Sequence, residues 1–310
     1  RAEIVETEGG RYLLMDYHHI IMDGTSSEYF FLRRDMSAAY LGEELEESDY
    51  GMPEYAEEEK LSGPAFDRDR SYYIEKFSDI TLSSMSAGKS DSLGRLLRES
   101  VFIPLKEIEE WCLEHKVSTD VLFQAAFGHI LSVFTQEKKI AYTMMGHGRY
   151  DKRIQETYGM YVETLPVCVE KEAGMSVMDF LRANAREKML ALRHHAYPFT
   201  CFCQELEKRP GIGFNFLAME DAEEKLYLGD IVLPLRQIDP LKVCLDLTVS
   251  VYRVDHNLQI SVSSGEYRND QSLLKAFAEA MKDTIGNMMR KPLEIYIHIP
   301  FCLKKCAYCD

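Results

Sequence analysis

The stretch YHHIIMDGTS occupies residues 17–26 and places two adjacent histidines ahead of an aspartate and a glycine. Histidine has an unperturbed pKa of about 6.5, so its imidazole exchanges a proton near neutral pH. The apolar run before it, residues 11–19, predicts a strand, and residues 25–41 predict a helix with Thr25 or Ser26 at its cap. A histidine at the end of such a strand would project into a cleft and take a proton from an incoming amine or hydroxyl.

Asp23 and Gly24 give this pattern its local geometry. The Asp23 carboxylate would fold back under the turn, and Gly24 would permit a tight backbone path into the helix, whose N-terminus carries partial positive charge. Adjacent histidines in a strand point to opposite faces, so at most one of them faces a given cleft. A metal site is the alternative, although two adjacent histidines are not a usual ligand spacing.

Composition restricts the class of protein. The chain has 310 residues, 46% of them hydrophobic and 28% charged, which is typical of a soluble globular protein of one or two domains. Its net charge of −15 disfavours nucleic acid as a partner. No apolar run long enough for a membrane span and no secretory signal is seen. We therefore expect a cytoplasmic protein with reduced thiols in its core, at Cys112, Cys168, Cys201, Cys203 and Cys244.

The order of the expected elements predicts a mixed α/β fold. An acidic, irregular segment (43–70) and a Ser/Gly-rich linker (83–94) divide the chain into two blocks. Helices are predicted at 70–77, 104–116, 118–136 (capped by Ser118), 176–195 and 269–289, and further strands at 139–145, 161–170, 211–219, 230–238, 243–254 and 258–265. Strands and helices do not alternate strictly, which favours layered sheets with helices on one face over a doubly wound parallel sheet.

Several motifs together resemble one family. HHIIMDG resembles the HHxxxDG motif of the condensation domains of nonribosomal peptide synthetases, which chloramphenicol acetyltransferase shares. Further stretches agree in order: PEYAEEEK with RSYYIEKF, YGMYVETLPVCV (158–169) with GxFVNTLPL, HHAYPFTCFCQEL (194–206) with H-Q-D-Y-P-F, and GIGFNFLAM (211–219) with an F-N-Y-type strand. Glu163 stands where the family usually has Asn, and Ala196 stands where Asp is common. The family's N-terminal stretch has no counterpart.

The resemblance implies a two-lobe, chloramphenicol-acetyltransferase-like sandwich with a tunnel between the lobes. Residues 1–290 would form the condensation domain, with 1–82 as the remainder of an incomplete N-lobe, 83–94 as the linker and 95–290 as the C-lobe. A donor acyl thioester and an acceptor amine would enter from opposite sides, each on the phosphopantetheine arm of a peptidyl or aminoacyl carrier domain. The expected reaction is amide or ester formation in nonribosomal peptide synthesis.

The same resemblance implies roles for single residues. His19 would be catalytic, as the general base or as a positioning residue for the attacking amine. His18 and Asp23 would be structural, with Arg149 as the partner of the Asp23 carboxylate, because a buried carboxylate needs a cationic partner. Gly24 would lend a backbone amide to the developing oxyanion. Two alternatives stay open: a stand-alone acyltransferase with an acyl-coenzyme A donor, and a non-catalytic module that docks carrier domains.

The last residues carry a second motif. CLKKCAYC places Cys302, Cys306 and Cys309 at spacings suited to three corners of a 4Fe-4S cluster, whose fourth iron would hold S-adenosylmethionine. A zinc site with His298 as the fourth ligand is the alternative. The flanking LEIYIHIPFCLKKCAYCD resembles the first strand and cluster loop of radical S-adenosylmethionine (radical SAM) proteins of the coproporphyrinogen oxidase and heme-chaperone type. That resemblance implies that residues 291–310 start a radical SAM domain, active only in the full-length protein, with Tyr308 beside the cofactor.

Overall fold

The structure is a computed structural model that describes residues 1–45, 50–58, 61–85, 95–209, 211–221, 225–236, 238 and 245–290. Most of the predicted linker and the whole C-terminal motif therefore lie outside the described residues.

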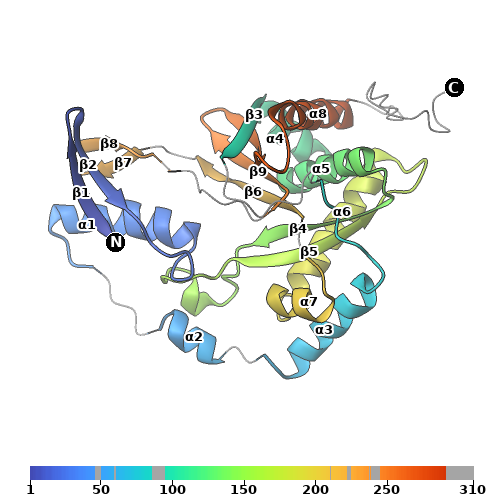
Figure 1. The fold of residues 1–310 in the computed structure, drawn as a ribbon, viewed down its shortest axis with the longest axis horizontal. Coiled ribbons are helices and arrows are strands. Elements are labelled where there is room, and N and C mark those ends of the chain that lie inside the picture. Colours follow the sequence, from blue (N-terminus) through green and yellow to red (C-terminus); the bar gives the residue numbers. More distant parts are fainter. Residues whose placement is uncertain are drawn as a thin grey trace.

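The N-terminal part is a hairpin followed by helices (Figure 1). Its elements are β1 (Ala2–Thr7), β2 (Gly10–Met15), the π-helix η1 (Thr25–Asp35), α1 (Met36–Leu41), α2 (Met52–Glu58) and α3 (Pro64–Phe77). The strand predicted over 11–19 ends at Met15, so both histidines lie in the turn beyond it. The helix predicted over 25–41 exists, but its first eleven residues are π-helical. π-Helical turns are rare and frequently mark functional sites.

The second part is built on a six-stranded sheet in the order β3-β10-β9-β6-β4-β5. Its strands are β3 (Leu96–Pro104), β4 (Lys139–Gly146), β5 (Glu163–Glu170), β6 (Ile212–Asp221), β9 (Leu247–Val254) and β10 (Asn257–Gly265). The helices are α4 (Leu105–His115), α5 (Thr119–Thr135), α6 (Val177–Arg193), α7 (Phe199–Glu205) and α8 (Gln271–Met289), with a short 3-10 helix, η2 (Lys152–Ile154). β4 pairs in parallel with β6 and β6 with β9, whereas the other neighbours are antiparallel. This confirms the mixed α/β prediction.

Helices cover both faces of this sheet, which corrects the prediction of one covered face. Side chains alternate between the faces of a strand. Ile140 and Tyr142 of β4 therefore face the main core beneath α4, α5, α6 and α8, whereas Ala141 between them faces a smaller core with Tyr73 of α3 and Phe202 of α7. Three elements were not predicted from the sequence: β1, β3 and α7. A second hairpin, of β7 (Lys225–Leu228) and β8 (Ile231–Pro234), was also not predicted, although a strand was expected at 230–238.

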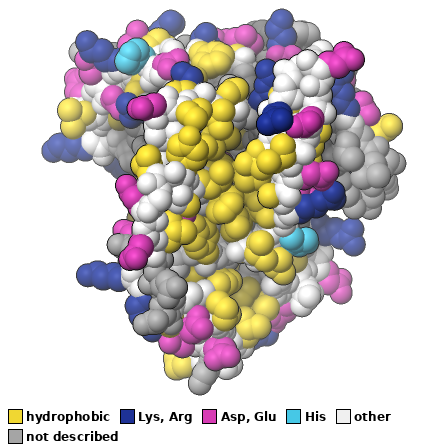
Figure 2. Space-filling model, turned by 90° about the vertical axis from the view of Figure 1, so that its left-hand side faces the viewer, with side chains coloured by type: hydrophobic (Ala, Val, Ile, Leu, Met, Phe, Trp, Pro, Cys, Tyr) yellow, Lys and Arg dark blue, Asp and Glu magenta, His cyan; other side chains and the backbone are white. Residues whose placement is uncertain are grey.

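The β7–β8 hairpin reaches the N-terminal part, where β7 contacts α1 and η1 (Figure 1). Figure 2 shows the side of the molecule that these elements occupy, with apolar side chains gathered in its middle. Large apolar side chains are exposed on both hairpins, among them Ile4, Tyr12, Leu13, Tyr227 and Val232. Among the described residues no single helix is long and apolar enough to cross a membrane, and the one helix pair that is, α4 with α5, is bent by 98°.

Candidate functional site

The hydrogen bond of His19 fixes which of its nitrogens is basic. Its Nδ1 lies 2.9 Å from the backbone carbonyl oxygen of Met22. A carbonyl oxygen only accepts, so Nδ1 carries the proton and donates it. In the neutral ring Nε2 then holds the lone pair. His19 as a whole is exposed to solvent.

His18 is held in the opposite way. Its Nδ1 lies 3.2 Å from the backbone nitrogen of Ile20 and accepts that hydrogen bond. An accepting Nδ1 carries no proton, so the neutral ring is protonated at Nε2. Two adjacent histidines thus adopt different tautomers: His18 closes the turn, and His19 presents a basic nitrogen.

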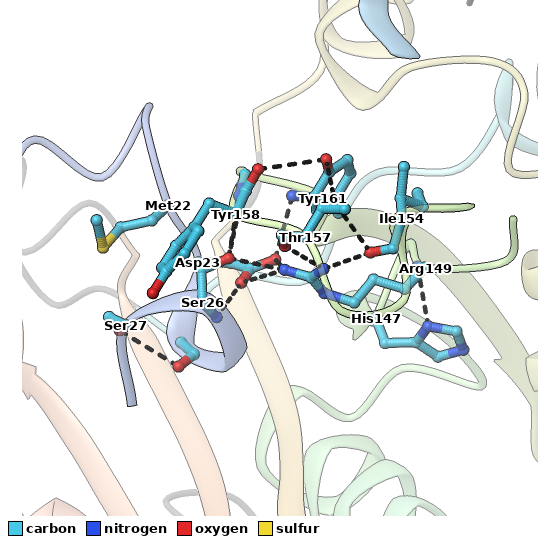
Figure 3. Close-up of polar contacts among 12 residues, drawn as sticks. Met22, Asp23, Ser26, Ser27, His147, Arg149, Ile154, Thr157, Tyr158 and Tyr161 are labelled. Atoms are coloured by element: carbon cyan, nitrogen blue, oxygen red, sulfur yellow. Dashed lines mark hydrogen bonds and ion pairs between the residues drawn. The ribbon is translucent and has the colours of Figure 1, made fainter. Parts of the chain in front are cut away.

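Asp23 is bound by a residue of the second part of the chain. Arg149 Nη2 lies 3.0 Å from Asp23 Oδ1 and 3.2 Å from Oδ2, and the two side chains are 6% and 0% exposed (Figure 3). The predicted ion pair is therefore present. The carboxylate also accepts the backbone N–H groups of Ser26 at 2.8 Å and of Tyr161 at 3.2 Å. A buried charge needs such a full set of partners to be tolerated.

The carboxylate of Asp23 caps the π-helix, which corrects the expectation that Thr25 or Ser26 does so. Its Oδ1 accepts the Ser26 amide, whereas the Ser26 hydroxyl donates to the carbonyl of Gly159 at 3.0 Å and accepts the Gly159 amide at 3.1 Å. The Asp23 amide donates to the same Gly159 carbonyl at 2.9 Å. The turn that carries both histidines (residues 16–23, here called the histidine turn) is thus bound to the segment that precedes β5.

The other terminal nitrogen of Arg149 is also bound, whereas its buried Nε has no hydrogen-bond partner among the described residues. Nη1 donates to the carbonyls of Ile154 at 2.7 Å and Thr157 at 2.8 Å. The guanidinium carbon lies 4.5 Å from the ring centroid of Tyr161 and 5.3 Å from that of Phe30, which is cation–π geometry. These contacts hold the cation in place independently of Asp23 (Figure 3).

Gly24 does not have the conformational role that the sequence suggested. Its φ of −58° and ψ of −41° are right-handed helical values that any residue adopts. A Cβ at this position would meet no other atom within 4 Å. Neither the backbone nor the packing of the chain requires glycine here, so the space beside Gly24 is open.

A second carboxylate, that of Asp69 in α3, was missed by the sequence analysis. Its side chain is fully buried and accepts hydrogen bonds from His194 Nδ1 at 2.8 Å, from the Ala196 amide at 3.0 Å and from Arg68 Nε at 2.7 Å. Burial alone would raise the pKa of Asp69, but these donors lower it below its ordinary value. Asp69 thus places a buried carboxylate against the backbone of Ala196 and beside His194.

The cysteine predictions divide into two groups. Cys112 and Cys168 are buried free thiols, and Cys201 and Cys203 are half-buried free thiols. Cys244, Cys302, Cys306, Cys309, Tyr308 and His298 lie outside the described residues. Within the described ranges no group of His, Cys, Asp and Glu side chains has the arrangement of a metal site.

Comparison with known proteins gives consistent matches. The model of the condensation domain family matches residues 1–296. Bacitracin synthase 1 of Bacillus licheniformis is 26% identical over 212 residues, which are 64% of this chain and 4% of that protein. Surfactin synthase subunit 1 of Bacillus subtilis is 22% identical over 310 residues, 93% of this chain and 8% of that protein. The chain therefore spans only a small part of the length of these synthases.

Solved structures show the same fold. The first condensation domain of the calcium-dependent antibiotic synthetase superposes with a TM-score of 0.73 at 17% identity, over 94% of this chain and 67% of that one. The starter condensation domain of rhizomide synthetase gives 0.70 at 20% identity, over 88% and 65%. With the family model matched over nearly the whole length, this chain belongs to the condensation domain family.

Proposed function

We propose that this chain is a catalytic condensation domain that joins a carrier-bound acyl thioester to a carrier-bound amine during nonribosomal peptide synthesis. One observation carries the proposal: the Nδ1–H of His19 is committed to the Met22 carbonyl, so the lone pair of this exposed imidazole is left on Nε2 to act as a base. Family membership supplies the reaction class, because the relatives include the bacitracin and surfactin synthases.

The proposed step transfers one acyl group. The acceptor nitrogen attacks the thioester carbonyl and forms a C–N bond, while His19 Nε2 takes the proton that the nitrogen loses. The tetrahedral oxyanion then collapses, the C–S bond breaks, and the donor pantetheine sulfur takes the proton from His19 and leaves as a thiol. An acceptor hydroxyl would follow the same course to an ester.

The other residues of the turn position this base. The Asp23–Arg149 pair holds the turn against the segment before β5, and the backbone bond to His18 closes the turn. The Gly24 amide is proposed to donate to the oxyanion, with the open space beside Gly24 leaving room for the substrate. These groups do not exchange protons with the substrate; they fix where His19 lies.

The proposed partners are a donor and an acceptor carrier domain, each with a phosphopantetheine arm, in the cytoplasm. The test is a turnover assay with the intact protein, a donor-loaded carrier and an aminoacyl-loaded carrier, followed by mass spectrometry of the carrier-bound product. We expect an amide product that disappears with His19→Ala. Product formation at the same rate from free acyl-coenzyme A would favour the stand-alone acyltransferase instead. Carrier binding with no product in either assay would favour the docking module.

The C-terminal cysteines support a separate proposal that rests on the sequence alone. We propose that Cys302, Cys306 and Cys309 bind a 4Fe-4S cluster in the full-length protein and that this cluster binds S-adenosylmethionine, with Tyr308 beside it. Anaerobic reconstitution should give a broad absorbance at about 400 nm that is lost when the three cysteines are replaced by serine. If the protein bound zinc tightly and no iron, the cluster proposal would be overturned in favour of the Cys₃His zinc site.

A further inference from the structure

Next to the Asp23–Arg149 pair lies a group of ionisable and aromatic side chains that the proposed reaction has not used: His147, Tyr150, Glu163 and His195, here called the Glu163 group. His195 Nδ1 lies 3.1 Å from Glu163 Oε1. The ring centroids of Tyr150 and His195 are 4.4 Å apart, and those of His147 and Tyr150 are 4.7 Å apart. One carboxylate and three rings thus stand together.

The Glu163 group adjoins the site through the backbone. His147 and Tyr150 flank Arg149, and the Arg149 amide donates to His147 Nδ1 at 3.0 Å (Figure 3). Glu163 begins β5 two residues after Tyr161, whose amide binds Asp23. A Cβ on Gly148 would lie 3.4 Å from Glu163 Cγ. The same two chain segments therefore hold Arg149 and the Glu163 group.

The Glu163 group is only partly open to solvent, and Glu163 Oε2 is itself buried. The side chains of Glu163 and His195 are 24% and 29% exposed. The Tyr150 hydroxyl and Glu163 Oε2 converge on Gly146, where a Cβ would lie 3.2 Å and 3.6 Å from them. Burial and the Glu163 charge raise the pKa of Tyr150, so its hydroxyl stays protonated at neutral pH.

A carboxylate beside aromatic faces is the chemistry that recognises an organic cation. The carboxylate supplies the charge, and the ring faces attract the ammonium through their quadrupole. The sequence is consistent with this: Glu163 stands where the family's stretch usually has Asn, so this chain places a carboxylate, in contact with His195, at that position.

We propose that Glu163, oriented by His195, binds the ammonium group of the acceptor substrate and so determines that the acceptor is an amine rather than a hydroxy acid. The inference rests on the proposed function for the identity of the acceptor. Glu163 is a specificity-determining residue in this account. The bound ammonium first releases one proton to solvent and becomes the neutral amine, and the second proton passes through His19 to the leaving thiol.

The test is a binding experiment without a donor, so that no turnover is needed. Isothermal titration calorimetry of the full chain uses two probes: the alanyl amide of aminopantetheine and its lactyl counterpart, which has a hydroxyl in place of the ammonium. We expect the alanyl probe to bind at least about tenfold more tightly, a difference of about 1.4 kcal/mol. Glu163→Gln should reduce that preference to less than about twofold, and Glu163→Asp should restore part of it.

A matched control separates the specific effect of Glu163→Gln on ammonium binding from the effect of losing one negative charge anywhere on the protein. Glu187 forms a half-buried ion pair with Lys76, away from the turn, so Glu187→Gln should keep the full preference. A third probe, the 6-amino-2-hydroxyhexanoyl amide, carries its ammonium on the side chain only. Tight binding of this probe and not of the alanyl one would assign the bound cation to the side chain.

The proposal fails if the wild-type protein binds the alanyl and lactyl probes equally, or if Glu163→Gln weakens both to the same degree. The turnover assay reports separately on the proposed function. Selective binding without any condensation product would overturn the catalytic proposal alone, and condensation without selectivity would overturn the Glu163 assignment alone.

Discussion

The guanidinium of Arg149 lies across the carboxylate of Asp23, with Nη2 within 3.2 Å of both oxygens, although 126 positions separate the two residues. This contact joins the histidine turn to the second part of the chain. Removing one partner leaves the other charge buried, which costs about 3–5 kcal/mol. We therefore expect Asp23→Ala to lower the free energy of unfolding by that amount in urea titrations.

The matched control for that experiment is an exposed pair. Arg153 and Asp151 also form a salt bridge, with side chains 49% and 31% exposed. Solvent screens this exposed pair, but Asp151→Ala also removes the side chain that caps η2 by accepting the Arg153 amide, so we expect a loss of about 0.5–2 kcal/mol, well below that of Asp23→Ala. If both variants unfolded at the same urea concentration, the Asp23–Arg149 pair would not be a main support of this fold.

The two histidines should respond differently to substitution. His19→Ala removes the basic Nε2, and we expect condensation to slow by about 10²–10⁴-fold with unchanged folding. His18→Ala removes only an acceptor for the Ile20 amide, so it should lower stability by about 0.5–1.5 kcal/mol, and His18→Asn should recover part of this loss. Turnover assays and urea unfolding of all three variants measure these effects on activity and on stability. A His19→Ala protein with wild-type turnover contradicts the assignment of the base.

Gly24→Ala separates folding from function. Because φ and ψ are helical and no atom lies within 4 Å of the added methyl, the free energy of unfolding should stay equal or rise by about 0.4–1 kcal/mol. The methyl would occupy the space proposed for the substrate, so condensation should slow by roughly tenfold or more. An alanine variant with full activity would remove Gly24 from the proposed site.

Gly148 is the opposite case, because the fold itself requires glycine there. Its φ is +65°, and a Cβ would lie 1.6 Å from the carbonyl oxygen of Tyr161. Gly148→Ala should cost more than the roughly 1–2 kcal/mol of a left-handed residue, since the Tyr161 carbonyl must also move. Gly174, with φ of +77° and no atom within 4 Å, is the control that carries only the conformational cost. Equal thermal unfolding of both alanine variants would disprove the close contact.

His129 in α5 should make stability depend on pH. Burial, and to a lesser degree Lys171, lower its pKa to about 4 from 6.5. The unfolded chain then binds a proton that the folded chain does not, so stability falls as pH drops from about 6.5 towards 4, by up to about 1.4 kcal/mol per pH unit. His129→Leu should remove this part of the slope in urea titrations at several pH values. A variant with the same slope as the wild type would show that His129 does not cause it.

The sequence by itself determined the local features. Helical periodicity located α5, α6 and α8, and β-rich composition located β4, β5 and β10, because these signals depend on neighbours along the chain. It placed the two histidines at the end of a strand, whereas they lie in the turn beyond Met15, and the resemblance to condensation domains named Arg149 as the partner of Asp23. Local propensity did not determine the π-helix of η1, nor that Asp23 rather than Ser26 caps it, since both depend on contacts with Gly159 and Tyr161.

Only the tertiary structure decided which nitrogen of each histidine is basic and what surrounds the site. A tautomer is set by the partner of the other ring nitrogen, and the sequence carries no record of that geometry. Asp69 accepts a hydrogen bond from the Ala196 amide, which is 127 residues away in the sequence, and Glu163 contacts His195, which is 32 residues away. Pairs of this kind form where the sheet and helices bring distant segments together, so periodicity along the chain cannot reveal them.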